Sequence, residues 1–149
     1  MELGPGWQEW GLAGLFLASF LAATLLPLGS EAVLAAMALA GWEPMGLFVA
    51  ATLGNWAGGM STYALGRWGS PERLAGRMPR SGGGLERWRG RAARWGPWLA
   101  LFCWAPVVGD LIALLLGVFR VSWRPVALLM GLGKAARYAV VLWVVMPWR

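Results

Sequence analysis

Long stretches without any charged residue are the feature of this sequence that most restricts its fold. The run from Pro44 to Gly66 has 23 uncharged residues, and a helix needs about 20 apolar residues to cross the hydrocarbon core of a bilayer. A second long run, 125–148, is apolar apart from Lys134 and Arg137. The two runs predict transmembrane helices over 44–66 and 125–148, and an all-α integral membrane protein.

The composition supports this class and excludes others. Only 13% of the residues are charged and 58% are hydrophobic, whereas soluble domains have about 25% charged and about 45–50% apolar residues. So little charge argues against a soluble enzyme, a disordered chain or a nucleic-acid-binding module. The sequence has no histidine and one cysteine, Cys103. We therefore expect no catalytic residues, no enzyme activity, no metal site, no disulfide and no cofactor.

Two shorter apolar regions, 11–42 and 95–119, are each interrupted by residues that break helices and then by an acid. Proline removes a backbone donor and glycine allows a chain reversal. The apolar legs on either side have about 9–16 residues, which span only part of a membrane at 1.5 Å per residue. Each region is therefore predicted to be a re-entrant hairpin. The breakers and the acids are Pro27, Gly29, Ser30 and Glu31 in the first region, and Pro106, Gly109 and Asp110 in the second.

The two halves of the chain match at an offset of 79 residues. This offset aligns both prolines and both acids of the hairpins, and it aligns Asn55 with Lys134. Each unit of the repeat is a re-entrant hairpin followed by one transmembrane helix. Because such a unit crosses the membrane once, the second unit enters from the opposite face. The chain is thus predicted to be a single membrane domain, 1–149, built as an inverted repeat, which is a plan of many transporters.

A basic segment, 67–94, holds eight of the thirteen basic residues. Cytoplasmic loops of membrane proteins carry such an excess, so we expect this loop in the cytoplasm, both termini outside, and the N-terminal region retained rather than cleaved as a signal peptide. From Leu85 a short amphipathic helix is predicted, with Trp88, Ala92 and Trp95 on its apolar face. It lies either at an anionic membrane surface or in a solvated linker.

Charged and polar residues inside the apolar segments are candidates for a transport site, because they are expensive in a membrane. Glu31 and Asp110 either line a substrate and proton pathway or compensate free N–H groups at helix starts. Lys134 and Arg137 share a helix face, and they either bind an anionic headgroup or pair with the acids to hold helices together. Asn55 either lines the path or forms a hydrogen bond between helices.

Three glycines of the first transmembrane helix, Gly54, Gly58 and Gly59, give this helix a face of small residues. Small residues let neighbouring helices approach closely in membranes. We expect them to serve helix packing.

The chain resembles the DedA membrane-protein family, also called VTT or SNARE-associated Golgi proteins, and in particular its small bacterial YqaA-like members. The resemblance lies in five motifs between about Gly11 and Tyr138: Leu26-Pro27-Leu28-Gly29-Ser30-Glu31-Ala32, Gly54-Asn55, Tyr63 with Gly66-Arg67, Pro106-Val107-Val108-Gly109-Asp110, and Gly133-Lys134-Ala135-Ala136-Arg137-Tyr138. It implies two facing re-entrant hairpins, a bacterial cytoplasmic (inner) membrane location and lipid transport, including that of undecaprenyl phosphate. Larger members carry an arginine in the second hairpin, whereas this hairpin carries Asp110.

These observations favour a transporter or flippase for an anionic lipid, either a polyprenyl phosphate or a phospholipid. Lys134 and Arg137 would bind the phosphate, and Glu31 and Asp110 would exchange protons. Two alternatives remain, namely a proton-coupled carrier of small ions or solutes and a membrane assembly factor that transports nothing. The expected partners are membrane lipids with anionic headgroups, and protons, but no nucleic acid.

Overall fold

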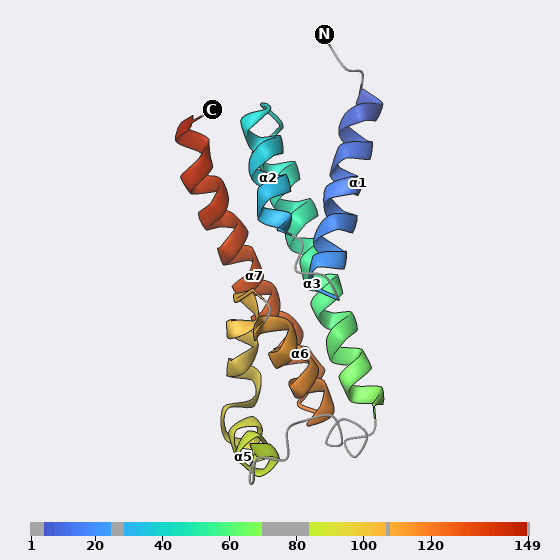
Figure 1. Cartoon of the computed structure of the whole chain (residues 1–149), viewed down its shortest axis with the longest axis vertical. Coiled ribbons are helices and arrows are strands. Elements are labelled where there is room, and N and C mark those ends of the chain that lie inside the picture. Colours follow the sequence, from blue (N-terminus) through green and yellow to red (C-terminus); the bar gives the residue numbers. More distant parts are fainter. Residues whose placement is uncertain (1–4, 25–28, 70–83, 107, 149) are drawn as a thin grey trace. The chain divides into compact units, whose positions relative to one another are not determined.

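The computed structural model describes residues 5–24, 29–69, 84–106 and 108–148. Within these ranges the chain forms helices and short connections, and no β-strand occurs there (Figure 1). The all-α prediction is therefore confirmed for this part of the chain. The elements are α1 (Pro5–Ala22), α2 (Ser30–Leu39), α3 (Pro44–Trp68), α5 (Gly84–Trp95), the 3-10 helix η1 (Gly96–Trp104), α6 (Val108–Val118), α7 (Trp123–Val145) and the 3-10 helix η2 (Met146–Trp148).

The chain forms two compact units that share its two longest helices. Unit 1 comprises Met1–Gly58 and Lys134–Arg149, and unit 2 comprises Gly59–Gly133. The chain therefore passes from one unit to the other twice, once inside α3 and once inside α7.

Unit 1 packs α1 and α2 with the first part of α3 and the last part of α7. Its core is formed by side chains from all four helices: Leu15, Leu34, Ala38, Leu47, Ala51, Tyr138 and Leu142. The start of α1, the connection from α2 to α3 and the end of α7 lie at one end of this unit (Figure 1). Glu43 stabilises the start of α3, because its carboxylate accepts hydrogen bonds from the backbone N–H groups of Met45 (3.0 Å) and Gly46 (2.6 Å).

Glycines allow α3 to lie unusually close to α1. A Cβ atom at Gly54 would collide with the carbonyl oxygen of Phe16, and one at Gly58 with that of Phe20. Both glycines therefore lie at a helix contact that a larger side chain would disrupt. Gly59, the third residue of the predicted small face, is buried in unit 2.

Unit 2 contains a reciprocal glycine contact between α3 and α6. A Cβ atom at Gly66 of α3 would collide with the carbonyl oxygen of Leu114, and one at Gly117 of α6 would collide with that of Tyr63. Gly133 of α7 lies in the same way against the backbone of η1 at Leu101. Close backbone contacts at glycines thus join α3 to α6 and α7 to η1 within this unit.

The observed elements differ in length from the predicted hairpin legs. The helix α1 has 18 residues and begins at Pro5, six residues before the predicted leg, so it measures about 27 Å. The second legs, α2 with 10 residues and α6 with 11, are shorter than α1 and lie within the predicted range of about 9–16 residues. The segment from Gly96 to Trp104 is a 3-10 helix of nine residues. Such a length is uncommon, because 3-10 runs beyond about 3–4 residues have poor hydrogen-bond geometry.

The positions of the helices follow the 79-residue offset closely. The starts of α3 and α7, Pro44 and Trp123, are 79 residues apart (123 − 44), and so are the last residues of α2 and α6, Leu39 and Val118 (118 − 39). Corresponding helices therefore occupy corresponding places in the two halves of the chain.

Of the described helices, α7 alone is both long and apolar enough to cross a membrane by length and composition. The helix α3 has sufficient length, with 25 residues, but its Gly, Asn, Ser and Thr residues lower its hydropathy. The predicted crossing of α3 remains a prediction.

The basic segment is described at 67–69 and from Gly84 onwards. The helix α5 begins at Gly84 and ends at Trp95, which confirms the predicted short helix, whereas 70–83 lies outside the described residues. On the predicted apolar face Ala92 is buried, but the side chain of Trp95 is 55% exposed. The predicted apolar face of α5 is therefore only partly buried.

Candidate functional site

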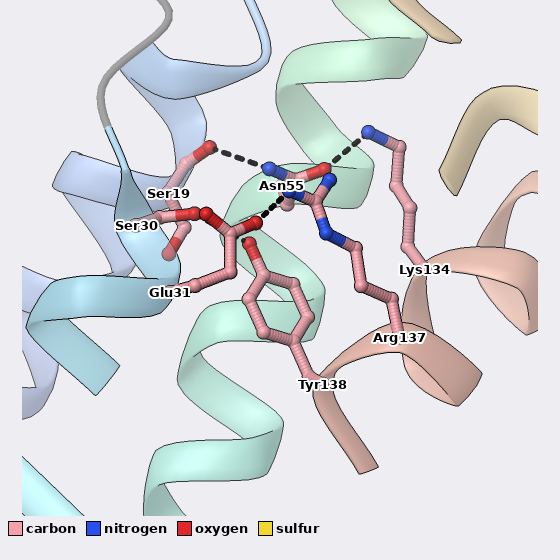
Figure 2. Close-up of polar contacts among 7 residues, drawn as sticks. All are labelled: Ser19, Ser30, Glu31, Asn55, Lys134, Arg137 and Tyr138. Carbon is pink, nitrogen blue, oxygen red and sulfur yellow. Dashed lines mark hydrogen bonds and ion pairs between the residues drawn. The ribbon is translucent and has the colours of Figure 1, made fainter. Parts of the chain in front are cut away.

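Polar side chains from four helices gather inside unit 1 (Figure 2). We call this group the polar cluster. It consists of Ser19 of α1, Ser30 and Glu31 of α2, Asn55 of α3, and Lys134, Arg137 and Tyr138 of α7. The cluster therefore contains two cations and one carboxylate.

The central contact is an ion pair between the guanidinium of Arg137 and the carboxylate of Glu31. The side chains are 18% and 28% exposed, respectively. Glu31 lies in the first turn of α2, where the helix dipole also favours a negative charge. The position of Glu31 agrees with the helix-start interpretation, and its ion pair agrees with a charge pair that holds helices together. A role of Glu31 in a substrate and proton pathway stays a prediction.

A buried hydrogen bond joins the sequence neighbours of this ion pair, Ser30 and Tyr138. The hydroxyls of Ser30 and Tyr138 are 2.8 Å apart, and either can be the donor. The Tyr138 side chain is fully buried, and a buried tyrosine hydroxyl usually finds a partner. Sequence reasoning treated Ser30 only as a hairpin breaker and did not select Tyr138, although the tyrosine next to Arg137 in an apolar helix was the available signal.

Lys134 is almost completely buried, with 2% exposure, and its ammonium donates a hydrogen bond to Oδ1 of Asn55. The amide nitrogen of Asn55 in turn donates to the carbonyl oxygen of Ser19, at 3.3 Å. This chain of contacts connects α7, α3 and α1. Asn55 and Lys134 are also the two positions that the 79-residue offset aligns.

Two buried hydroxyls of unit 1 have no hydrogen-bond partner among the described residues, namely Oγ of Ser19 and Oγ1 of Thr52. A buried hydroxyl without a partner costs about 1–3 kcal/mol. Ser19 was not selected from the sequence, although a serine within the apolar stretch Phe16–Ala22 was a signal. These hydroxyls are free to bind a water molecule or a substrate atom.

Asp110, the second acid of the predicted site, lies in the first turn of α6 and is half-buried. It belongs to unit 2, whereas the polar cluster belongs to unit 1. The expectation that Asp110 and Glu31 share one cavity therefore stays a prediction.

The structure describes most of the predicted hairpin breakers. Gly29 precedes α2, and Pro106 lies in the turn between η1 and α6. Gly109 is buried, and a Cβ atom there would collide with the carbonyl oxygen of Cys103. Pro27 lies outside the described residues.

A helical chain with an apolar helix of membrane-spanning length and a buried group of charged side chains is typical of an integral membrane protein, and comparison with known proteins supports this class. The chain belongs to the family of the inner membrane protein YqaA. It is 46% identical over 131 residues to YqaA of Escherichia coli K12 and to YqaA of Shigella flexneri, covering 87% of each chain. It is 33% identical over 152 residues to an uncharacterized protein of Haemophilus influenzae, covering 95% of this chain and 91% of that protein. This chain is therefore a membrane protein.

No protein-family model and no solved structure matches the chain. The resemblance to the wider DedA family thus depends on the sequence motifs alone.

Proposed function

We propose that this protein moves an anionic lipid across the bacterial inner membrane, and that the polar cluster binds the lipid phosphate. The observation that carries the proposal is the ion pair of Arg137 with Glu31 beside the buried Lys134. Ionisable groups inside a membrane protein are expensive, and they usually mark a path for an ion or a substrate.

Competition for Arg137 is the central step of the proposed mechanism. A phosphate forms charge-assisted hydrogen bonds with a guanidinium as a carboxylate does, so an entering headgroup displaces Glu31 from Arg137. A carboxylate that loses its cationic partner out of bulk water favours the protonated form. Phosphate binding is thereby coupled to proton uptake by Glu31, and release of the lipid restores the ion pair and returns the proton.

An inverted repeat of re-entrant hairpins is the architecture that we propose for this path. The matching positions of the helices in the two halves support it, and so does the contact between Asn55 and Lys134. Two residues that a two-fold repeat relates to each other can touch only near its axis. The polar cluster would then lie near the pseudo-two-fold axis, where binding sites of inverted-repeat transporters are found.

Reconstitution in liposomes tests this function. We expect the purified protein to speed the crossing of a fluorescent phosphatidylglycerol analogue more than that of a phosphatidylcholine analogue, and an imposed pH gradient to change the rate. Liposomes without protein provide the background. Uptake of a small solute without lipid movement would instead support a solute carrier, and no movement of either would support an assembly factor.

The proposed topology places the basic segment 67–94 in the cytoplasm and both termini outside, with two membrane crossings, by 44–66 and 125–148. We expect a cysteine at position 82, introduced as Gly82→Cys in a Cys103→Ala background, to react with a membrane-impermeant maleimide only after the cells are opened. A cysteine near the N-terminus, introduced as Gly6→Cys, is the matched control and should react in intact cells. Labelling of position 82 in intact cells would contradict the topology.

A further inference from the structure

One end of unit 2 brings together three segments that are far apart in the sequence. The hydroxyl of Tyr63, in α3, donates a hydrogen bond to the carbonyl oxygen of Val121, in the connection between α6 and α7. A Cβ atom at Gly96, where α5 passes into η1, would lie 3.4 Å from the side chain of Val121. The last part of α3, the end of α5 and the α6–α7 connection therefore meet at Val121.

Exposed arginines surround this meeting point. One lies in the last turn of α3, one in the last turn of α5, one immediately before Val121 and one at the start of α7: Arg67, Arg94, Arg120 and Arg124. Among the side chains that the structure describes in unit 2, Asp110 is the one carboxylate. It lies in the first turn of α6, at the other end of that helix from Arg120. The described surface at this end is therefore cationic.

Exposed tryptophans accompany three of the arginines. Trp68, Trp95 and Trp123 are 82%, 55% and 54% exposed and are sequence neighbours of Arg67, Arg94 and Arg124. The guanidinium of Arg124 lies over the ring of Trp123, with 5.7 Å to the ring centroid. Tryptophan is enriched at the level of lipid headgroups, and guanidinium groups match phosphate geometry. We call these four arginines and three tryptophans the arginine–tryptophan rim.

Arg120 has an unusual backbone conformation. It follows the end of α6 with φ of 53°, in the left-handed region. Hydrogen bonds from its own N–H to Gly117 (2.9 Å) and from Val121 N–H to Leu116 (3.1 Å) form a helix cap in which glycine is the usual residue. The backbone of an arginine is strained in this conformation. Strained backbone conformations of this kind cluster at functional positions.

A hydrogen bond also orients Arg67. Its Nη1 donates to the hydroxyl of Tyr63 at 3.2 Å, one turn earlier on α3. The tyrosine that joins α3 to Val121 thus also holds one guanidinium at the same end of the unit, while the Arg67 residue stays exposed.

We propose that the arginine–tryptophan rim binds the headgroups of anionic phospholipids at the membrane surface. Four guanidiniums supply the charge, and the three tryptophan rings fit the apolar edge of the headgroup layer. This surface belongs to unit 2, whereas the polar cluster lies in unit 1, so the inference does not depend on lipid transport.

The test measures thermal unfolding of the full chain in detergent with added phosphatidylglycerol or phosphatidylcholine. We expect phosphatidylglycerol to raise the Tm of the wild type more, because a ligand of the folded state stabilises it. Arg120→Gly removes the backbone strain and one cation together. It should raise the Tm without lipid by about 2–4 °C and weaken the phosphatidylglycerol response about fivefold in apparent affinity, the effect expected of one interfacial cation.

Two further variants separate the rim from general charge effects. Arg120→Gln keeps the unusual backbone and loses the charge, so it should lose affinity as Arg120→Gly does. Arg87→Gln removes an exposed arginine from the first part of α5 and should change the affinity by less than twofold. Equal losses in the Arg87 and Arg120 variants, or equal responses to the two lipids, would overturn the proposal. Loss of the response in Arg137→Gln alone would also overturn it, since the lipid would then bind the polar cluster.

Discussion

Glu31→Gln is expected to abolish lipid transport while the protein still folds and inserts. Glutamine keeps the size of the side chain and one acceptor oxygen, but its amide cannot take up and release a proton. The proposed exchange of Arg137 between the carboxylate and the phosphate would therefore stop. Flipping of fluorescent phosphatidylglycerol in liposomes measures the loss, and the elution profile of the purified variant in detergent reports folding.

The partner variant removes the cation of the same pair. Arg137→Ala leaves the Glu31 carboxylate without its observed cation, so both transport and stability should fall. Removal of one partner from a fully buried pair costs about 3–5 kcal/mol. Because the side chains here are 18% and 28% exposed, we expect a smaller loss of unfolding free energy.

The double variant Glu31→Gln with Arg137→Gln distinguishes a transport role from a structural one. It removes both charges, so it should recover the expression and Tm that Arg137→Ala loses, because no charge of the pair is left without its partner. Transport should stay absent. Recovery of transport together with stability would mean that the pair only holds α2 and α7 together, and would contradict the proposed mechanism.

Gly117→Leu is expected to destabilise the fold strongly. Even a Cβ atom at this position would collide with the carbonyl oxygen of Tyr63, which is backbone and cannot rotate away. The helices α3 and α6 would have to separate, and overpacking of this kind costs about 1–3 kcal/mol or more. The Tm in detergent and the yield of folded protein measure this effect.

Gly14→Leu is the matched control, because it makes the same substitution within a helix. No atom lies within 4 Å of a Cβ built at Gly14, and leucine has a higher helix propensity than glycine by nearly 1 kcal/mol. This variant should keep or raise the Tm. A similar loss in both variants would indicate a general intolerance of leucine, and the close contact of α3 with α6 would then not explain the result.

The sequence was sufficient to predict the helical class and several helix starts, because apolar runs and their breakers are local signals. The helix α2 begins directly after Gly29, and α6 begins two residues after Pro106. Ser30 and Gly109, which were also predicted as breakers, instead lie in the first turns of these helices. Pro5 begins α1, and proline is favoured in the first turn of a helix, so this earlier start had a signal that went unused. The 3-10 geometry of η1 had none, since it depends on contacts with the rest of unit 2.

The contacts of the candidate site were harder to predict than its members. Glu31, Asn55, Lys134 and Arg137 all lie in the polar cluster, because buried polar residues in apolar helices are conspicuous. Periodicity cannot decide which cation pairs with Glu31, since Lys134 and Arg137 share a helix face. Whether Arg137 or Lys134 pairs with Glu31 depends on how α2 packs against α7. Local sequence patterns do not specify this packing.

The contact between Asn55 and Lys134 has a consequence for how such a protein is assembled. Two identical protomers around a two-fold axis would place the same residue against itself. Two lysines there would repel because both are positively charged, and neither can accept a hydrogen bond from the other. An amide facing an ammonium is complementary, but it requires two different halves. In the proposed repeat, both halves belong to one polypeptide, so one half can carry Asn55 and the other Lys134. A buried cation can then lie at the axis without facing a second copy of itself.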